Sequence, residues 1–320
     1  MKIHLAPMEG VVDHNMRRIL TDIGGYDRCV TEFIRVTSHP VPLKVFKRLC
    51  PELETGGMTP SGTPVFVQLL GGDPDLIAKS ALTAVKAGAP GIDLNFGCPT
   101  KIVNRHDGGS VLLKYPHRIG NIVSAVRQTI DPAIPVCAKI RLGFENSDYL
   151  DENVDHVYSA GASELCIHAR TRNQGYKPPA YWSELANLPR NAKTDLIVNG
   201  EIWSVQHAEL AKIESGCSNI MIGRGGLARP DLAKLIRAQN DSNDLNPLAW
   251  QEVVALVDKF FCDQDSNRAR YAGNRTKQWL VYLGKQYTHA LELFKSLKRL
   301  TSVDEINQAI YLHRKGLEMS

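Results

Sequence analysis

Short apolar segments of strand length recur along the first part of the chain, alternating with segments whose apolar residues follow helical spacing. The strand-like segments span residues 2–8, 28–33, 65–70, 91–94, 135–140, 164–168, 195–199 and 219–223. Helical patterns occupy 9–21, 73–87, 112–129, 150–159, 181–188, 204–215 and 228–238, while 35–63 is irregular apart from a short helix at 42–49. Nearly continuous apolar strands are typical of a parallel sheet covered on both faces. Eight strand–helix units predict an α/β fold, a closed (β/α)8 TIM barrel.

An open doubly wound sheet is the alternative, but no Gly-x-Gly-x-x-Gly sequence follows the first strand. The pattern changes near residue 240. Residues 239–249 are polar, contain Pro247 and predict a linker. Beyond Trp250 the apolar residues recur at helical spacing only, as at Val253, Val257 and Phe260. We therefore expect a barrel domain at residues 1–240 and a small all-helical domain at 241–320.

Composition narrows the class of protein without identifying it. The apolar fraction of 43% is ordinary for a globular chain, and the net charge is +4. The seven cysteines form no Cys-x-x-Cys pair, which argues against a zinc ribbon or an iron–sulfur cluster and favours a reduced, cytoplasmic setting. Residues 1–10 do not resemble a signal peptide, and no run of about 18 apolar residues occurs. We expect no membrane association and see no sign of an obligate protein partner.

Polar residues stand at nearly every predicted strand end, where the chemistry of a TIM barrel is located. They include Gln68, Asn95, Lys139, His168 and Asn199. An apolar core needs none of these residue types, so we interpret them as the lining of a pocket. No second histidine or carboxylate accompanies His168 at ligand spacing, so we expect it to form hydrogen bonds to a ligand and not to bind a metal.

Two glycine-containing turns follow the last two predicted strands, at 199–201 and 223–226. Backbone N–H groups in such turns hold phosphate groups, and these two loops are the usual phosphate site of the fold. Arg224 would add positive charge there. Gln68 suits a polar ring edge and Lys139 suits a ring that gains negative charge, so the pattern favours flavin mononucleotide (FMN). The alternative for Lys139 is a Schiff-base lysine, as in barrel aldolases.

Cys98 lies where a buried strand gives way to Gly97 and Pro99, two residues that interrupt strands. A lone cysteine is commonly a small buried apolar residue, and this structural interpretation stays open. Its position at a strand end, with the Asn95 amide beside it, also makes Cys98 a candidate proton donor to a polar heterocycle.

The basic residues of the helical region are concentrated in residues 267–299. This segment holds eight basic residues and one acidic residue, a net charge of +7, so the remainder of the chain is slightly acidic. Four aromatic residues are interleaved with them: Tyr271, Trp279, Tyr282 and Tyr287. Basic groups neutralise phosphates and aromatic faces stack on bases, so the segment suits nucleic acid. A solvated helix face with its aromatic residues turned into the core explains the same composition.

Six short segments together resemble the tRNA-dihydrouridine synthases. They are Ala6-Pro7-Met8-Glu9-Gly10, Asp93-Leu94-Asn95-Phe96-Gly97-Cys98-Pro99, Lys139-Ile140-Arg141, His168-Ala169-Arg170-Thr171, Asn199-Gly200-Glu201-Ile202 and Ile222-Gly223-Arg224-Gly225. They occur in the family's order, and the resemblance covers essentially the whole chain. Phe96 and the run 103–109 are most similar to the bacterial C-type subfamily, which acts on uridine 16 in the tRNA D-loop.

The resemblance implies an FMN-dependent oxidoreductase with a helical tRNA-binding domain, NADPH as electron donor and no metal. It implies that uridine becomes 5,6-dihydrouridine, with hydride passing from FMN N5 to C6 and a proton from Cys98 to C5 while Asn95 contacts the uracil. The residues expected to bind FMN are Pro7, Met8, Glu9, Gln68, Lys139, His168, Asn199, Gly200, Glu201, Gly223 and Arg224. The further candidates for contacts with substrate or tRNA are Arg35, Arg141, Tyr176, Arg275, Lys277 and Trp279.

Three other functions stay open from the sequence. An FMN barrel dehydrogenase acting on a free pyrimidine leaves the basic helical segment unexplained. A Schiff-base aldolase would make the purified protein colourless. A non-catalytic RNA-binding protein leaves Cys98 and the two phosphate-type turns unexplained.

Overall fold

Parallel strands in the first 222 residues close into a barrel. The computed structural model describes residues 1–240, 245–263 and 269–318. In the described chain the barrel strands are β1 (Ile3–Leu5), β2 (Arg28–Val30), β4 (Val65–Leu70), β5 (Ile92–Asn95), β6 (Val136–Arg141), β7 (Glu164–His168), β8 (Asp195–Asn199) and β9 (Asn219–Ile222). Each pairs in parallel with its neighbours, and β1 pairs with both β2 and β9, which completes the closure. The predicted (β/α)8 barrel is confirmed.

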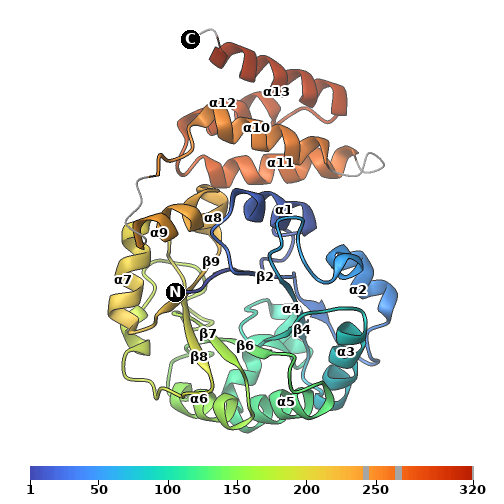
Figure 1. The fold of residues 1–320 in the computed structure, drawn as a ribbon, viewed down its shortest axis with the longest axis vertical. Coiled ribbons are helices and arrows are strands. Elements are labelled where there is room, and N and C mark those ends of the chain that lie inside the picture. The colour runs from blue at the N-terminus through green and yellow to red at the C-terminus, as the bar shows by residue number, and fades with distance from the viewer. Residues whose placement is uncertain (241–244, 264–268, 319–320) are drawn as a thin grey trace.

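Helices surround the barrel as the apolar spacing predicts (Figure 1). They are α1 (His14–Ile23), α2 (Leu43–Leu49), α3 (Pro74–Lys86), α5 (Pro116–Thr129), α6 (Leu150–Ser159), α7 (Val205–Ser215) and α9 (Leu232–Asn240). Side-chain caps fix three of their starts: Asp13 accepts from Met16 N at 2.9 Å, Asp73 accepts from Leu76 N at 2.9 Å, and Ser204 accepts from His207 N at 3.1 Å. Such caps satisfy backbone N–H groups that have no partner within the helix.

Several boundaries differ from the sequence-based prediction. The helix expected at 228–238 is divided into α8 (Arg224–Ala228) and α9, because Pro230 lies between them and cannot continue a helix. The segment expected at 181–188 forms only a 3-10 turn, Trp182–Leu185. Another 3-10 turn, Gly109–Lys114, precedes α5, which begins at a proline suited to the first helical position. Further short elements are β3 (Ile34–Arg35), a 3-10 turn at Pro51–Thr55 and α4 (Lys101–Arg105).

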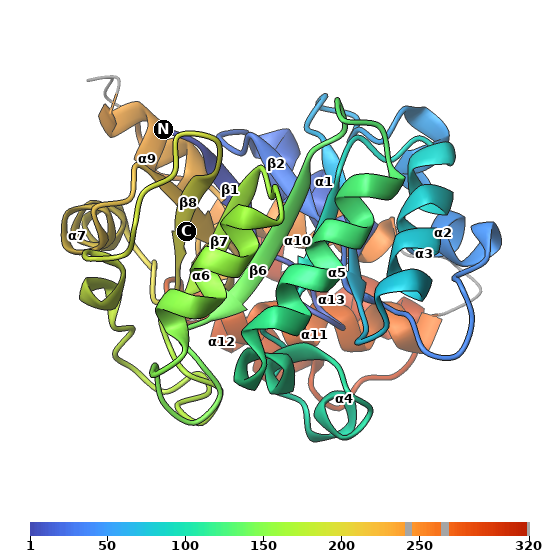
Figure 2. The same ribbon diagram turned by 90° about the horizontal axis from the view of Figure 1, so that it is seen from below.

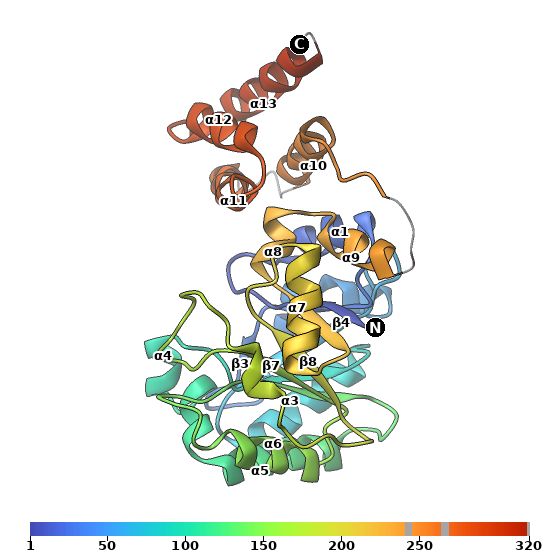
Figure 3. The ribbon, with the colours of Figure 1, turned by 90° about the vertical axis from the view of Figure 1, so that its left-hand side faces the viewer.

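The remaining helices form a bundle that packs against the side of the barrel. They are α10 (Trp250–Cys262), α11 (Ala269–Leu283), α12 (Thr288–Leu297) and α13 (Val303–Glu318). The bundle contacts the barrel where α11 meets α8 and α10 meets α1. Figures 2 and 3 both show α11 and α12 on the same side of the molecule as α4, which follows the Cys98 turn. The domain boundary at 240/241 stays a prediction, because 241–244 lie outside the described residues; the linker expected at 239–249 is described only in part.

The barrel interior has a charged layer that the apolar strand pattern did not suggest. Near the N-terminal ends of the strands, buried Arg28 forms an ion pair with Glu164 and lies 4.2 Å from the Phe66 ring centroid. His4 Nδ1 lies 3.0 Å from the Arg28 guanidinium group. The next layer is an apolar cluster of Ala6, Val30, Cys166, Ile197 and Met221. Ala6 and Met221 also line the cavity above it, so this cluster is part of the cavity floor.

Candidate active site

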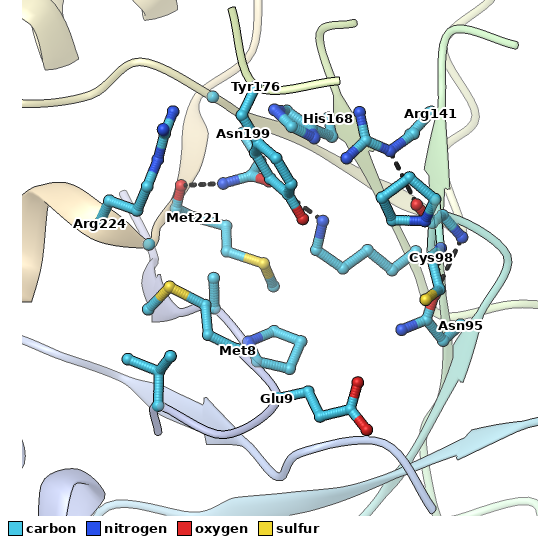
Figure 4. Close-up of a pocket in the computed structure, with 18 of the residues that line it drawn as sticks. Met8, Glu9, Asn95, Cys98, Arg141, His168, Tyr176, Asn199, Met221 and Arg224 are labelled. Carbon is cyan, nitrogen blue, oxygen red and sulfur yellow. Dashed lines mark hydrogen bonds between the residues drawn. The ribbon is translucent and has the colours of Figure 1, made fainter. Parts of the chain in front are cut away.

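A cavity of about 500 Å³ opens at the carboxyl ends of the barrel strands (Figure 4). All eleven side chains and glycines expected to bind a cofactor line it: Pro7, Met8, Glu9, Gln68, Lys139, His168, Asn199, Gly200, Glu201, Gly223 and Arg224. Asn95, Cys98, Arg141 and Tyr176 line it as well. The structure therefore brings together residues that are up to 217 positions apart in the chain, as a closed barrel requires.

The Asn95 side chain holds the turn that carries Cys98. Its Oδ1 accepts hydrogen bonds from the backbone N–H groups of Gly97, at 2.9 Å, and Cys98, at 3.0 Å. On its other side, Asn95 Nδ2 donates to Gln68 Oε1 at 2.8 Å. The turn is stable locally because one side-chain carbonyl satisfies two backbone donors that the strand can no longer pair.

Cys98 is 7% exposed and reaches the cavity wall opposite Met8 and Arg224 (Figure 4). Its Sγ donates to Thr100 Oγ1 at 3.3 Å, and its carbonyl oxygen accepts from Ser110 N, at 3.1 Å, and from Asn104 Nδ2, at 3.2 Å. The backbone of Cys98 is thus held on both sides. Cys166 lies beneath the cavity in the apolar cluster, and burial raises its pKa to about 12.

Lys139 brings a cation into the cavity wall. Its Nζ donates to Asn199 Oδ1 at 3.0 Å, and Asn199 Nδ2 in turn donates to Met221 O at 2.8 Å. Among the described residues, no carboxylate lies within ion-pair distance of this ammonium group. Burial lowers the pKa of Lys139, since water cannot solvate the charged form. An anionic ligand group in the cavity would favour the charged form of Lys139.

His168 is held as a neutral imidazole. Arg170 Nη1 lies 3.1 Å from His168 Nε2, and because a guanidinium group only donates, Nε2 is the acceptor and Nδ1 carries the proton. Burial, together with the positive charges of Arg141, Lys139 and Arg170, lowers the pKa of His168 well below its ordinary value. His168 therefore offers a hydrogen-bond donor that does not titrate in the neutral range.

Glu201 gathers three donors at the rim between β8 and β9. Arg170 Nη2 lies 2.8 Å from its Oε1, Arg224 Nη2 donates to the same oxygen at 2.7 Å, and Trp203 Nε1 donates to Oε2 at 3.0 Å. Burial opposes ionisation of Glu201, but the hydrogen bonds from Arg170 and Trp203 and the charges of Arg170 and Arg224 together lower its pKa. Glu201 has a φ of 54°, unusual for a residue with a side chain, so the loop is bent to present this carboxylate.

Cations and aromatic rings alternate across the mouth of the cavity. Tyr176 lies between Arg141 and Arg224, whose guanidinium carbons are 5.1 and 5.3 Å from its ring centroid. The guanidinium carbon of Arg224 is also 5.1 Å from the centroid of the Trp203 ring, and Lys285 Nζ of the bundle lies 5.4 Å from the same centroid. Each pair is within the range of a cation–π interaction. We call this row of side chains the mouth ladder: Arg141, Tyr176, Arg224, Trp203 and Lys285.

Arg170, Trp203 and Tyr282 escaped the sequence analysis as site residues. Arg170 stands in the His168-Ala169-Arg170-Thr171 segment but is fully buried, and the Lys177 and Pro179 carbonyl oxygens, 2.7 and 3.0 Å from its Nε, fix its direction. Arg170 lies two residues after the end of a predicted strand, and this position could have marked it as a site residue in the sequence analysis. Tyr282 comes from α11 and reaches the cavity because the bundle packs beside the mouth, which no local pattern indicates.

The residues expected to contact RNA from the bundle lie mostly elsewhere. Trp279 is 2% exposed, packs edge-on against Phe260 at 5.2 Å and donates to Leu227 O at 3.0 Å. Arg275 is 5% exposed and donates to the carbonyl oxygens of Gly10 and Val11. These two assignments need correction, because both side chains connect the bundle to the barrel and are inaccessible to RNA in this structure.

Two further candidates are accessible, and two charges of the basic segment, those of Arg268 and Arg270, cannot be placed. Lys277 is half-buried, with Nζ donating to Leu300 O at 2.5 Å. Arg35 is exposed on β3 beside the end of β4, but it does not line the cavity. Arg268 of the basic segment lies outside the described residues.

The cavity fits an anionic, planar cofactor such as FMN. It offers the half-buried ammonium group of Lys139, the neutral imidazole donor of His168 and Arg224 at one end, with Met8 and Met221 as apolar contacts. A Cβ at Gly200 would lie 2.9 Å from the His168 ring, and one at Gly225 would lie 1.9 Å from Ile202 O, so both loops approach their neighbours as only glycine allows. Within the described residues no cluster of three or more His, Cys, Asp or Glu suits a metal ion.

The fold and the lined strand-end cavity define a TIM-barrel enzyme. A solved structure with the same fold, the old yellow enzyme from Trypanosoma cruzi, aligns with a TM-score of 0.50 and 13% identity over 78% of this chain and 91% of that chain. The chain belongs to the dihydrouridine synthase family, whose model matches residues 4–309.

Curated relatives match over nearly their whole length. The tRNA-dihydrouridine(16) synthase of Shewanella oneidensis is 47% identical over 307 residues, covering 96% of each chain. The enzyme of the same name from Pseudomonas putida is 43% identical over 319 residues, covering 99% of each. In the parts of the chain that the structure describes, no helix is long and apolar enough to cross a membrane.

Proposed function

We propose that this chain reduces the C5=C6 bond of uridine in tRNA to 5,6-dihydrouridine, with FMN as cofactor, NADPH as electron donor and uridine 16 as the target. Family membership supports the reaction, and relatives at 42–47% identity are named for position 16. The observation that carries the proposal is the cavity itself, because the Cys98 thiol and the half-buried Lys139 ammonium group both lie on its walls.

The residues that would hold FMN follow from the charge pattern of the cavity. The turns at 199–201 and 223–225, with Arg224, would bind the phosphate, and Gln68 would bind a polar edge of the ring system. Lys139 would stabilise the negative charge of the reduced ring in a site from which water is excluded. When bound, FMN supplies the hydride for uracil C6 after its reduction by NADPH.

The chain's own groups then act on the base. A uridine in the D-loop must leave its stack to enter a barrel mouth, and Tyr176, 54% exposed at the rim, offers a ring for it to contact. Asn95 would orient the uracil, and Cys98 would donate its thiol proton to C5 as a general acid. Arg141 is held by its bonds to Gly97 O, at 2.7 Å, and Gly175 O, at 2.9 Å, so its charge is fixed beside the base.

Substitution Cys98→Ala tests the reaction and the proton donor together. We expect the purified variant to keep its bound flavin and its flavin reduction by NADPH, because neither step needs the thiol. Dihydrouridine formation in tRNA should fall by about a hundredfold or more, the usual contribution of a general acid. Mass-spectrometric mapping of dihydrouridine measures the loss and gives the position modified.

The matched control is Cys262→Ala, which removes an exposed cysteine of α10 far from the cavity and should leave the rate unchanged. Cys98→Ala activity within a few-fold of the unsubstituted enzyme would refute the general-acid role. A purified protein without a flavin spectrum, or tRNA without dihydrouridine, would refute the proposed reaction.

A further inference from the structure

We propose that Asp93 is a positioning residue: its carboxylate sets the direction of a hydrogen-bond chain through Gln68 and Asn95 that holds the Cys98 turn in place for proton transfer. The inference rests on the proposed function for its catalytic meaning. The hydrogen-bond chain itself is a property of the folded protein and can be tested separately.

The hydrogen-bond chain runs from the cavity wall at Cys98 inward to Asp93 in the barrel interior. Asp93 Oδ2 accepts from Gln68 Nε2 at 2.6 Å, Gln68 Oε1 accepts from Asn95 Nδ2 at 2.8 Å, and Asn95 Oδ1 accepts from Cys98 N at 3.0 Å. Asp93 is 1% exposed and Gln68 is fully buried. Strand pairing keeps the members together, because Gln68 of β4 stands opposite Asp93 of β5.

The two ends of this chain determine the orientation of both amides. An ionised carboxylate only accepts hydrogen bonds, so Gln68 must turn its NH₂ group toward Asp93 and its oxygen toward Asn95. Asn95 must then turn its NH₂ group toward Gln68, which leaves its oxygen for the backbone donors of the turn. Those backbone N–H groups only donate. If either amide were reversed, two donors would face each other, and a buried unpaired polar group costs about 1–3 kcal/mol.

Burying an ionised carboxylate costs more free energy than one hydrogen bond to an amide returns. We therefore infer that Asp93 serves to orient Gln68. Burial raises the pKa of Asp93 to about 6 against the hydrogen bond from Gln68 and the positive charges of Arg28 and Lys139. Asp93 has no ion pair within 4.0 Å among the described residues, because the nearby Arg28 is paired with Glu164. A neutral residue here would avoid this cost but would not impose one orientation on Gln68.

Only the N–H side of the Cys98 backbone depends on the hydrogen-bond chain from Asp93. Ser110 and Asn104 hold the Cys98 carbonyl oxygen, and they do not depend on Asp93. The Cys98 N–H is held by Asn95 alone among the described side chains. If the Asp93 carboxylate is removed, the Cys98 N–H should lose its fixed acceptor while the Cys98 carbonyl oxygen stays bound. The turn can then rotate about that carbonyl group and move Sγ without unfolding the loop.

Two substitutions of graded strength test the proposal in the flavin-loaded enzyme. Asp93→Asn keeps the shape but can present either an acceptor or a donor to Gln68, and Asp93→Leu removes the acceptor. We expect the rate of single-turnover dihydrouridine formation to fall by about tenfold for Asp93→Asn and by about a hundredfold for Asp93→Leu. Losses of this size are usual when an active-site group loses the hydrogen-bond partner that orients it or is displaced slightly. tRNA affinity should change little, and the rates are expressed per bound flavin because Gln68 is itself a proposed flavin contact.

The matched control is Glu164→Gln, which removes a neighbouring buried carboxylate that bonds to Arg28 and not to a cavity residue. It should leave the rate per bound flavin unchanged. If Glu164→Gln and Asp93→Asn slow the reaction equally, or if Asp93→Asn and Asp93→Leu retain the full rate, the directional role is overturned. A double-mutant cycle with Asn95→Ala adds a second criterion: additive losses would show that Asp93 does not act through Asn95.

Alkylation of Cys98 provides a readout that does not need the reaction. In the protein without tRNA, iodoacetamide should modify Cys98 faster in Asp93→Asn than in the unsubstituted chain, with the exposed Cys262 as an internal reference. Unchanged alkylation in both Asp93 variants would overturn the proposal. If the unsubstituted enzyme forms no dihydrouridine, the proposed function fails, and the alkylation rates still decide whether Asp93 positions Cys98.

Discussion

At the scale of single residues, two buried histidines link stability to pH. His4 is 1% exposed beside Arg28, and burial with that charge lowers its pKa to about 2. The pKa of His168 is lowered in the same direction by burial and by the surrounding arginines. Both side chains must stay neutral in the folded state, whereas both take up protons below about pH 6.5 when the chain unfolds.

The free energy of unfolding should therefore be highest above about pH 6.5 and fall as the pH decreases. Each histidine can contribute up to about 1.4 kcal/mol per pH unit, and Asp93, whose pKa is raised to about 6, opposes them between about pH 4 and 6. Urea unfolding at pH 7.5 and 5.5 should show a net loss of about 1–2 kcal/mol. His4→Gln should reduce this loss, and a loss of the same size in that variant would contradict the assignment.

The site residues that could be predicted are those whose direction follows from strand geometry. Side chains alternate along a strand, so a polar residue at a strand end such as Gln68 or Asn199 must face either the barrel interior or the helices, and polarity favours the interior. Arg170 and Trp203 lie on loops, where contacts with distant carbonyl and carboxylate oxygens set the direction. Sequence spacing contains no information about those contacts.

At the scale of elements, α11 shows why composition misplaced the RNA contacts. Its basic and aromatic residues are distributed around the helix, and the sequence does not reveal which face the barrel covers. The barrel covers the face of α11 that carries Trp279 and Arg275, whereas Lys285, just beyond the helix, lies at the mouth of the cavity. Strand and helix positions were predictable because buried faces repeat at 2 or 3.6 residues, whereas the docking of one domain on another depends on both surfaces.

Trp279→Ala should destabilise the junction between bundle and barrel. It removes a buried ring and its hydrogen bond to Leu227 O, and we expect a loss of about 3–5 kcal/mol in the free energy of unfolding. Chemical denaturation measures this. Leu312→Ala on α13, where the side chain is 56% exposed, is the control and should change stability by less than about 0.5 kcal/mol. Equal effects of the two substitutions would contradict the structural role of Trp279.

At the scale of the whole molecule, the bundle presents a surface with exposed basic residues, and one of them, Lys285, lies beside the cavity mouth at Trp203. The exposed basic residues on or beside α11 and α12 are Lys285, Lys295, Lys298 and Arg299. Figure 3 shows these two helices on the same side of the molecule as α4. The mouth ladder continues this surface into the cavity. A polyanion bound to the bundle would therefore lie next to the opening through which a base must enter.

Lys285→Glu tests whether this surface binds tRNA. We expect weaker binding and a slope of log affinity against log salt that is smaller by about 1, because one phosphate contact is lost. Fluorescence anisotropy at several salt concentrations provides both values. Lys86→Glu is the control, since Lys86 is exposed at the end of α3, away from the mouth. The docking surface is rejected if both variants keep the affinity and slope of the unsubstituted protein.

Tyr282 has a consequence for how this chain can be recombined with its relatives. Because Tyr282 of α11 is part of the cavity lining and Lys285 lies over the Trp203 ring, the barrel and the bundle both border a single chamber. A chimera that joins this barrel to a foreign bundle would exchange part of the chamber along with the docking surface. Productive hybrids should therefore keep the 201–203 loop and Tyr282 from the same parent, wherever the crossover in the chain is placed.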